Sequence, residues 1–416
     1  MTTNDSPQSV VIVGGGVAGI SAARELRRLG YDGDLTIVDA GAAPYDRPPL
    51  SKDYLLGTKT MPDIHLAPAK WFADQNVTLV TTTRVERIEP DAGQVLLSDA
   101  SVLHADAIIL ATGGTPRPLP VPGGDLPAVH VLRSAEDADR LRAALTPGTR
   151  LLVIGAGLIG AETASTALHL GASVTLVDPM SVPLLPAVGP EVAAFLHAQH
   201  PERGITTIHG SVTGIAQESQ TSPLVATLAT GDTIEADLVL AGIGITADTA
   251  LAEAAGLDID NGVIVDYSQR TSHPRVFAAG DSSRRRGPDG VLSRRAEHWD
   301  AAEGTGRAAA AGVLGREPVT EISSWFWTDR HGIHVEGVGD MSPSGTTVLR
   351  GTLGDGPATV FRLDGDRVVG AVSIDDSNAI RAARRMIDGR ISVTAEDLSN
   401  PEHNLRSLLR STASKG

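Results

Sequence analysis

Short, unbroken apolar runs that end in glycine recur along this chain and define its predicted elements. Residues 10–40 have the pattern of strand, helix and strand, and a second unit of this kind begins at Arg150. The runs 107–113 and 238–244 are also alike, because each predicts a buried strand that ends in glycine. Strands that alternate with helices predict parallel sheets, and the order of the runs predicts that the second unit is inserted into the first domain.

The segments outside these units carry weaker patterns. Residues 41–75 are rich in proline and predict irregular structure. Residues 79–88 and 94–97 predict short strands, and the Pro/Gly-rich stretch 115–127 predicts a crossover between domains.

The last third of the chain predicts a return to the first domain and then a new one. The run 276–281 predicts a strand of the first domain, and the alanine-rich stretch 295–312 predicts a helix. From about Trp325, short predicted strands and a predicted helix indicate an α+β domain; they span 359–363, 368–374 and 378–387. The predicted fold class is α/β, with two Rossmann-like domains and a C-terminal α+β domain. The expected segments are 9–117 and 246–324 for the first domain, 118–245 for the second, and 325–416 for the third.

Both strand–helix units carry a glycine fingerprint. The first runs from Gly14 to Gly19 and is followed by Asp39, and the second runs from Gly155 to Gly160 and is followed by Asp178. The first glycine of each permits a tight turn, the second lets a pyrophosphate lie against the backbone, and the third lets the helix pack on the strand. The phosphates then face free N–H groups at a helix N-terminus, and the acid accepts hydrogen bonds from the ribose.

Two fingerprints in matched context predict two dinucleotides, and hence a redox enzyme that passes electrons from a nicotinamide to a flavin. The alternative for either fingerprint alone is a glycine-rich turn that binds no ligand. No arginine follows Asp178, since the next residues are Pro179, Met180 and Ser181. A 2′-phosphate would meet a carboxylate there, so the sequence favours NADH over NADPH.

Composition narrows the function further. The formal net charge of −15 argues against a nucleic-acid partner. The chain has no cysteine, which excludes a cysteine-ligated iron–sulfur cluster, a redox disulfide and a thiolate nucleophile on it. No apolar run approaches the roughly 18–20 residues of a membrane span, and we expect a cytoplasmic protein. The 12 histidines are scattered, and His331 and His334 lack further ligands in a metal-binding pattern, so no metal site is predicted.

Several motifs resemble one enzyme family. They are 47–52 (RPPLSK), 132–133 (LR), 155–162 (GAGLIGAE), 278–281 (AAGD), 295–299 (RAEHW) and 325–329 (WFWTD). In these motifs the chain resembles the FAD-dependent ferredoxin reductases of oxygenase systems, from about Val10 to Ile387, and this implies a glutathione-reductase-like fold. Glutathione-reductase-type enzymes carry a cysteine pair where this chain has 48–52. One departure is that residues 329–337 are more polar than expected for the family.

The resemblance implies FAD in the first cradle and NAD in the second. The residues that it assigns to FAD are Gly14, Gly16, Val17, Ala18, Gly19, Asp39, Arg47, Pro48, Lys52, Val85, Ala111, Thr112, Gly113, Arg133, Asp281, Glu297, His298, Trp299 and Trp327. The residues assigned to NAD are Gly155, Gly157, Leu158, Ile159, Gly160, Glu162, Asp178, Gly242, Ile243 and Gly244.

The resemblance also implies catalytic roles for Lys52 and Glu162, as an ion pair where hydride passes between nicotinamide and flavin. A lysine there would favour the electron-rich reduced ring. The helix predicted from Arg295 would point its N-terminus, with His298 in its first turns, at the pyrimidine edge of the flavin. Each assignment has an ordinary alternative: two unrelated charges, a turn-forming aspartate at 281, a surface arginine at 133, or a core tryptophan at 327.

A basic group stands out in this acidic chain, formed by Arg284, Arg285, Arg286, Arg294 and Arg295. It could dock an acidic ferredoxin-type iron–sulfur protein that serves a cytochrome P450 or a non-haem iron oxygenase, or it could be a solvated loop. Two other functions stay open. One is a flavoprotein with another acceptor (rubredoxin, a quinone or oxygen), and the other is a redox-sensing interaction protein like apoptosis-inducing factor. A monomer and a homodimer are both compatible with the sequence.

Overall fold

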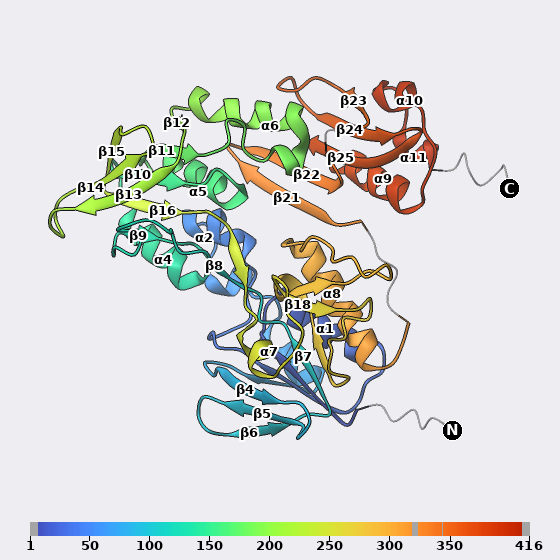
Figure 1. Cartoon of the computed structure of the whole chain (residues 1–416). Coiled ribbons are helices and arrows are strands. Elements are labelled where there is room, and N and C mark those ends of the chain that lie inside the picture. The colour runs from blue at the N-terminus through green and yellow to red at the C-terminus, as the bar shows by residue number, and fades with distance from the viewer. Residues whose placement is uncertain (1–6, 318–322, 343, 410–416) are drawn as a thin grey trace. The chain divides into compact units, whose positions relative to one another are not determined.

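The computed structural model describes residues 7–317, 323–342 and 344–409, whose contacts divide the chain into two units (Figure 1). The first unit contains 7–46, 60–115 and 245–317, and the second contains the rest. The domain boundaries expected after residues 117, 245 and 324 stay predictions, and residues 318–322, 343 and 410–416 lie outside the described chain. Residues 47–59, which the sequence analysis places in the first domain, make their contacts within the second unit.

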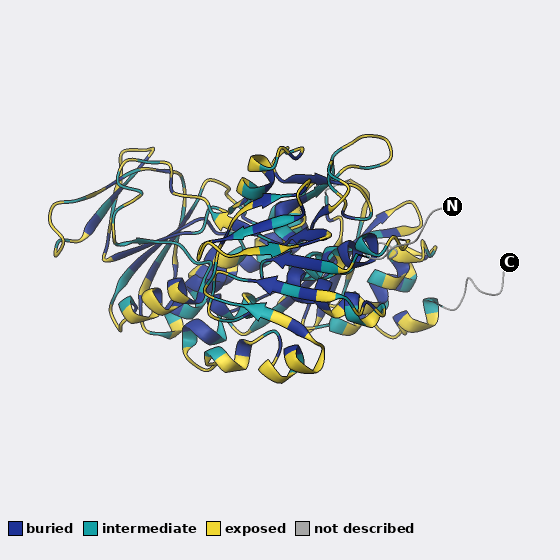
Figure 2. Ribbon diagram, turned by 90° about the horizontal axis from the view of Figure 1, so that it is seen from below, coloured by how far each residue is buried: buried dark blue, intermediate teal, exposed yellow. Residues whose placement is uncertain are grey.

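The first unit is built on a parallel sheet with the strand order β19-β7-β1-β2-β3. The glycine fingerprint follows β1, whose two neighbours in the sheet are β2 and β7, so it lies at the point where the strand order reverses. The bounds are β1 (Ser9–Val13), α1 (Val17–Arg28), β2 (Asp34–Val38), β3 (Val77–Val80), β7 (Ala107–Leu110) and β19 (Val276–Ala278). Its strands are largely buried, as the dark blue ribbon in Figure 2 shows.

Helix α8 (Trp299–Val313) packs on α1 at very short range. A Cβ on Gly306 would lie 2.2 Å from the carbonyl oxygen of Ala18, so only glycine allows this approach. The remaining elements of this unit are smaller. They are α3 (Ala69–Asp74), β4 (Val85–Glu89), β5 (Gln94–Leu97), β6 (Val102–His104), β8 (Gly114–Pro116), β17 (Ile245–Ala247), α7 (Ala250–Ala254), β18 (Val263–Val265), β20 (Ser283–Arg285) and the 3₁₀ turns η2 (Met61–Ile64) and η3 (Gly280–Ser282).

The second unit repeats this plan. Its parallel sheet has the order β12-β11-β10-β16-β9, with the second fingerprint between β10 and α5, and β10 lies between β11 and β16. In both units a three-stranded antiparallel sheet precedes the crossover strand: β4-β5-β6 before β7, and β13-β14-β15 before β16. The bounds are β9 (Val129–His130), α4 (Ala135–Ala144), β10 (Arg150–Ile154), α5 (Leu158–His169), β11 (Ser173–Asp178), β12 (Thr206–His209), β13 (Val212–Gln217), β14 (Leu224–Leu228), β15 (Thr233–Ala236) and β16 (Leu238–Ala241).

The end of the chain adds an antiparallel sheet, β21-β22-β25-β24-β23. One face packs on α9 through Phe361 and Ala371, and the other packs on α6 through Val360 and Val372. This sheet therefore forms a continuous core with α6, which follows the strand that ends in Asp178. The bounds are α6 (Leu185–Glu202), β21 (Trp325–Arg330), β22 (Ile333–Gly339), β23 (Thr346–Arg350), β24 (Ala358–Asp364), β25 (Arg367–Ile374), α9 (Ser377–Asp388), α10 (Ala395–Ser399) and α11 (Leu405–Leu408).

Three local predictions need correction. The helix predicted from Arg295 begins at Trp299, because His298 has extended backbone angles (φ −122°, ψ 152°) and is its N-cap. Residues 41–75 are not irregular throughout, since η1 (Pro48–Ser51), α2 (Asp53–Leu56), η2 and α3 lie there. The predicted strand over 79–88 is two strands, because β3 ends at Val80 and β4 begins at Val85. None of the helices in the described part of the chain combines the length and apolarity needed to cross a bilayer.

Candidate dinucleotide sites and ion-pair network

The first fingerprint forms a turn that only glycine can make. Gly14 has a φ of +108°, and a Cβ on it would lie 2.3 Å from the carbonyl oxygen of Ala111, at the end of β7. A Cβ on Gly19 would lie 1.9 Å from the carbonyl oxygen of Gly14. The strand end, the turn and the first helical turn are therefore in van der Waals contact, with the N-terminus of α1 at the carboxyl edge of the sheet.

Asp39 ties the second strand of this sheet to the fingerprint. Its carboxylate accepts hydrogen bonds from the backbone N–H groups of Gly15 at 2.5 Å and Gly41 at 2.6 Å. A carboxylate has about four acceptor positions, so two remain for other donors such as ribose hydroxyls. The acid thus orders the loop as well as being able to bind a sugar, a role that the sequence does not predict.

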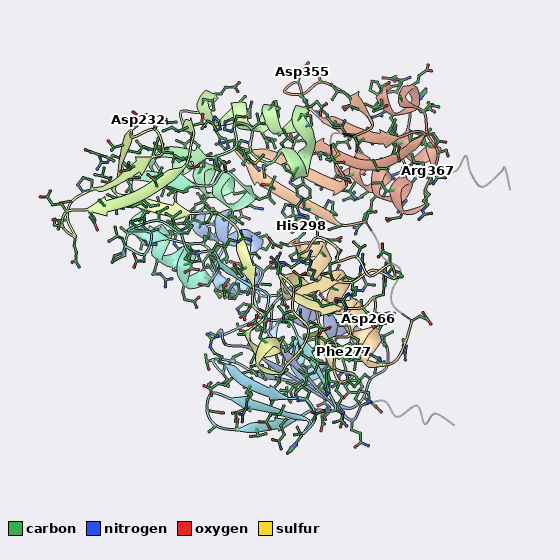
Figure 3. All side chains as sticks on the ribbon, viewed as in Figure 1. Asp232, Asp266, Phe277, His298, Asp355 and Arg367 are labelled. Carbon is green, nitrogen blue, oxygen red and sulfur yellow. The ribbon has the colours of Figure 1, made fainter. Side chains whose placement is uncertain are left out.

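Some of the other FAD-assigned residues of the first unit lie at the same edge. Ala111–Gly113 follow β7, where the Thr112 hydroxyl donates to the carbonyl of Asp248. Asp281 follows β19 in η3, and its carbonyl accepts a 2.7 Å hydrogen bond from Arg295. Gly16, Val17 and Ala18 lie at the start of α1. Val85, in contrast, begins β4 and is buried in the core. Glu297 and His298 precede α8 and Trp299 is its first residue; His298 is labelled in Figure 3.

The second fingerprint reproduces the first. Gly155 has a φ of +101°, and a Cβ on it would lie 2.5 Å from the carbonyl oxygen of Gly242, which follows β16. A Cβ on Gly160 would lie 1.9 Å from the carbonyl oxygen of Gly155. Asp178 accepts hydrogen bonds from the N–H groups of Ala156 at 2.7 Å and Met180 at 2.8 Å. The two acids therefore play equivalent parts.

Gly157 provides the test of whether a dinucleotide fits here. A Cβ on this residue would meet no atom within 4 Å, so the backbone is open at the position where a pyrophosphate must approach it. Leu158 and Ile159 open α5, and the side chain of Ile159 is exposed. Gly242, Ile243 and Gly244 follow β16 at the same edge of the sheet. The NAD-assigned residues are thus brought together around an open cradle. The FAD-assigned Arg47, Pro48, Lys52, Arg133 and Trp327 also belong to this second unit.

Glu162 lies one turn into α5 with only 4% of its side chain exposed. Its Oε2 accepts from the Ser51 hydroxyl at 2.5 Å, and its Oε1 accepts from the Thr328 hydroxyl at 2.6 Å and from the backbone N–H of Asp329 at 3.3 Å. The ammonium of Lys52 is 3.1 Å from the same Oε1. These four donors come from two segments, 51–52 and 328–329, that are distant from Glu162 in the sequence, and all point at carboxylate oxygens, which accept hydrogen bonds.

Lys52 is shared between two carboxylates. Its Nζ is 3.1 Å from Glu162 and 3.3 Å from Oδ2 of Asp329, and 15% of its side chain is exposed. It also lies 5.5 Å from the ring centroid of Trp327, a cation–π contact. Lys52 is therefore fixed at its tip by three groups, two of which sit on β21.

Arg330 fixes the orientation of Thr328. The Nη2 of Arg330 donates to the Thr328 hydroxyl oxygen at 3.2 Å, and because that oxygen carries a single proton, the proton is directed to Glu162. Arg330 is almost fully buried, and burial lowers its pKa to about 10 against the raising effect of Glu162 and Asp329. It stays charged at neutral pH and places a second cation near Glu162.

Comparisons with known proteins match nearly the whole chain to one family of reductases. A family model described as pyridine nucleotide-disulphide oxidoreductase matches residues 8–306, and one described as reductase C-terminal matches residues 325–409. Putidaredoxin reductase of Pseudomonas putida is 35% identical over 98% of both chains. A ferredoxin–NAD(+) reductase component of the anthranilate 1,2-dioxygenase system of Burkholderia cepacia is 37% identical and covers 97% of this chain and 100% of its own. The chain belongs to the pyridine nucleotide-disulphide oxidoreductase family.

A solved structure shows which kind of family member this chain is similar to in fold. The crystal structure of the covalent putidaredoxin reductase–putidaredoxin complex contains a chain that matches with a TM-score of 0.91 at 34% identity, covering 98% of this chain and 99% of that one. The protein is thus a flavoprotein oxidoreductase of the ferredoxin–NAD(+) reductase type, and the family implies FAD and NAD(P) as its dinucleotides. The family resemblance, the fold class and the enzyme class predicted from the sequence are confirmed.

The sequence missed part of the Glu162 network. Ser51 lies inside the motif 47–52, and Thr328 and Asp329 lie inside the motif 325–329, so their positions could have been found, but not their contact with Glu162. Arg330 and His334 belong to the polar run 329–337, whose unusual polarity was the available signal. Among the described residues, no three His, Asp or Glu side chains form a group that could hold a metal ion.

A histidine pair, buried at His200 and half-buried at His331, explains another part of that polar run. The ring Nε2 of His331, in the β21–β22 turn, is 3.0 Å from Nδ1 of His200 on α6. Two neutral rings make this hydrogen bond, with one donating and the other accepting. Burial first, and then the nearby arginines, lower the pKa of His200 to about 3 and that of His331 to about 4.

We therefore expect the protein to lose stability in mild acid. Both folded-state pKa values lie below the ordinary 6.5, so stability is full above pH 6.5 and falls as the pH drops toward about 4, since the unfolded chain binds more protons. His200 alone contributes a slope of up to about 1.4 kcal/mol per pH unit. Urea unfolding at pH values from 7 to 4.5 should show that the free energy of unfolding of His200→Gln falls less than that of the wild type. The control variant His104→Gln, at an exposed position on β6, should lose as much as the wild type. Equal losses in all three would contradict this assignment.

Proposed function

We propose that this enzyme binds FAD in the first cradle and NADH in the second, and delivers electrons to a ferredoxin-type iron–sulfur protein that serves a cytochrome P450 or a non-haem iron oxygenase. The observation that carries the proposal is the repetition of one acid-anchored glycine cradle in both units, at Gly14–Asp39 and Gly155–Asp178, with open backbone at Gly157 of the second. When bound, FAD supplies the conversion between a two-electron donor and a one-electron acceptor. The absence of cysteine supports an external acceptor over an internal disulfide.

The residues of the second unit would bind and orient the nicotinamide nucleotide. The N-terminus of α5 and the open backbone at Gly157 would face the pyrophosphate, and the two remaining acceptor positions of Asp178 would take ribose hydroxyls. Asp178 also supports the preference for NADH, because its carboxylate would repel a 2′-phosphate. Glu162 lies one turn into the same helix, and the pair that it forms with Lys52 would hold fixed charges beside the nicotinamide.

The acceptor is proposed from the relatives and from surface charge. A similar putidaredoxin reductase was crystallised in a covalent complex with putidaredoxin, which supports a small redox protein as the partner. Within the basic group of the first unit, Arg284 pairs with Asp260 at 2.8 Å, Arg285 stacks on Tyr267, and the side chain of Arg295 is 5% exposed. Arg286 and Arg294 are exposed, and they are the members that we assign to docking an acidic partner.

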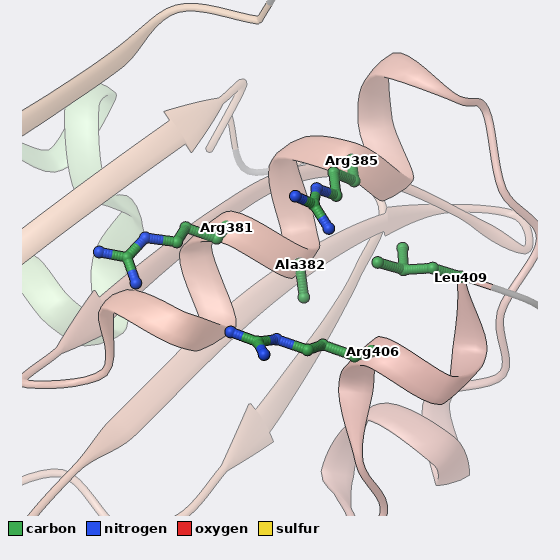
Figure 4. A pocket seen from close by; sticks show the side chains of 5 residues that line it. All are labelled: Arg381, Ala382, Arg385, Arg406 and Leu409. Atoms are coloured by element: carbon green, nitrogen blue, oxygen red, sulfur yellow. The ribbon is translucent and has the colours of Figure 1, made fainter.

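A second basic cluster offers a matched control. Arg381 and Arg385 on α9 and Arg406 on α11 line a hollow of about 470 Å³ together with Ala382 and Leu409 (Figure 4). All three arginines are exposed, so a charge reversal there changes the net charge by the same amount as one at Arg286 and Arg294. The two clusters therefore separate local docking from a general effect of charge.

The double variant Arg286→Glu/Arg294→Glu should lower kcat/KM for NADH-driven ferredoxin reduction about tenfold at low salt, since steering depends on complementary charge. Ferricyanide reduction should be unchanged, and the Arg381→Glu/Arg385→Glu control should reduce ferredoxin like wild type. The assay measures both acceptors over a range of ionic strength, with NADH and NADPH compared as donors. Equal salt slopes for the two acceptors, or an equal loss in the control, would contradict docking at Arg286 and Arg294.

A further inference from the structure

His334 has a carboxylate at each nitrogen of its ring. Its Nδ1 is 2.5 Å from Oδ1 of Asp329, the residue opposite it on β21, and its Nε2 is 3.0 Å from Oε1 of Glu336 on its own strand. Ionised carboxylates only accept hydrogen bonds, so both ring nitrogens must carry protons to satisfy them. The ring is therefore an imidazolium, and it is exposed enough, at 38% of its side chain, to exchange protons with water.

This imidazolium is one end of a row of alternating charges in the second unit. Asp329 meets His334 with one carboxylate oxygen and Lys52 with the other, and Lys52 in turn meets Glu162. The row reads Glu336, His334, Asp329, Lys52 and Glu162. Among the residues that the structure describes, two cationic side chains contact the Asp329 carboxylate directly, Lys52 and His334. Of these two, His334 is the one that can exchange its proton with water. A change at His334 therefore reaches Glu162 through three contacts, by way of Asp329 and Lys52.

We propose that His334 is a positioning residue whose charge sets how Lys52 is shared between Asp329 and Glu162. The proposal rests on the proposed function, which assigns the Lys52–Glu162 pair to the nicotinamide site. When His334 is charged, Asp329 has a cation of its own, and Lys52 is left to Glu162. When His334 loses a proton, Asp329 draws Lys52 toward itself, and the nearly equal contacts of 3.1 and 3.3 Å allow that exchange with a small movement.

The surroundings of His334 place its titration above the usual range of histidine. Partial burial by itself would lower its pKa, but hydrogen bonds to Asp329 and Glu336 outweigh burial, and the pKa is raised above 6.5. Asp375, from the turn after β25, accepts the backbone N–H of His334 at 3.2 Å and adds a third acid on that side. Glu336 is held in place by the Ser377 hydroxyl at 2.7 Å. His334 thus loses its proton at a higher pH than an ordinary histidine does.

The coupling can be measured without any turnover. In full-length protein labelled with ¹⁵N-histidine, the NMR titration of His334 is identified by its loss in His334→Gln. Lys52→Met should raise its midpoint by about half a pH unit, a threefold change in proton affinity, because Asp329 no longer shares its charge with a lysine. Glu162→Gln should lower the midpoint, since Lys52 then turns to Asp329. Asp355→Asn, on an exposed loop of the same unit, should leave it unchanged. A midpoint that neither Lys52→Met nor Glu162→Gln moves would overturn the proposal.

A second experiment asks whether this coupling affects the reaction. The rate constant of flavin reduction by NADH, followed by stopped flow between pH 6 and 9, should fall about threefold as His334 loses its proton, the size of the coupling above. His334→Gln should remove that pH dependence, and His403→Gln, an exposed histidine of the same unit, should keep it. An identical pH profile in His334→Gln would overturn the role in the reaction while leaving the proposed function intact. If NADH fails to reduce the flavin of the wild type at any pH, the proposed function fails, and the NMR titration still decides the coupling.

Discussion

Replacing Lys52 with methionine is expected to slow flavin reduction by NADH by about a hundredfold while FAD stays bound. The ammonium of Lys52 is the cation nearest to the buried carboxylate of Glu162 and also holds Asp329. Without it, Glu162 and the motif around Thr328 lose their fixed positions, and misplacement by about 1 Å is enough for a loss of this size. Although the resemblance places Lys52 beside the flavin, it lies outside the Gly14–Asp39 cradle that would hold FAD, so flavin content should match the wild type.

The same variant should cost stability, because it leaves a buried charge without its partner. We expect a loss of about 3 kcal/mol in the free energy of unfolding for Lys52→Met, since only 4% of the Glu162 side chain is exposed. Lys52→Met/Glu162→Gln should regain much of that stability but not the rate. The measurements are stopped-flow reduction and urea unfolding of both variants. Wild-type speed in Lys52→Met would rule out the role assigned to the pair.

Gly157→Ala is expected to raise the KM for NADH about a hundredfold with little change in stability. An added Cβ meets no protein atom within 4 Å, and the φ of −66° and ψ of −168° at this position are open to alanine. The methyl group would instead occupy the space where the pyrophosphate must touch the backbone. FAD content and the melting temperature should therefore stay near wild type while NADH binding is lost.

Two other glycines sharpen this test. Gly304→Ala also adds a methyl group to open space, in α8 of the first unit, and should leave the KM for NADH unchanged. Gly160→Ala should destabilise the second unit, because its Cβ would lie 1.9 Å from the carbonyl oxygen of Gly155. A wild-type KM in Gly157→Ala, measured by steady-state kinetics with NADH, would mean that the second fingerprint does not bind the nucleotide as proposed.

The features that the sequence predicts well are those coded by neighbouring residues. Each fingerprint, its strand and its acid lie within 30 residues of one another, and the turn requires glycine at Gly14 and Gly155 because of positive φ angles and contact with the next strand. Matched sequence patterns therefore gave the two parallel sheets and the return of the chain at 276–281. The start of α8 was missed because the backbone at His298 is extended and no residue pattern in 295–299 signals this.

The ion-pair network was only half predictable for the same reason. Lys52 and Glu162 were assigned as a pair from the family resemblance, and they are in contact, although their catalytic role stays a prediction. Thr328 and Asp329 reach Glu162 across 166 and 167 positions of the chain, and Ser51 across 111, so no periodicity signals these hydrogen bonds. The basic group at 284–295 also looks uniform in the sequence, whereas three of its members are engaged by Asp260, Tyr267 and Asp281.

The most direct test of the central claim, that one cradle holds FAD and the other accepts NADH, is an anaerobic titration of the purified protein with NADH, followed by its flavin absorbance. We expect yellow protein with about one FAD per chain, whose colour NADH bleaches and added oxidised ferredoxin restores. Colourless protein that takes up no FAD on reconstitution, or bound flavin that NADH leaves fully coloured, would contradict it.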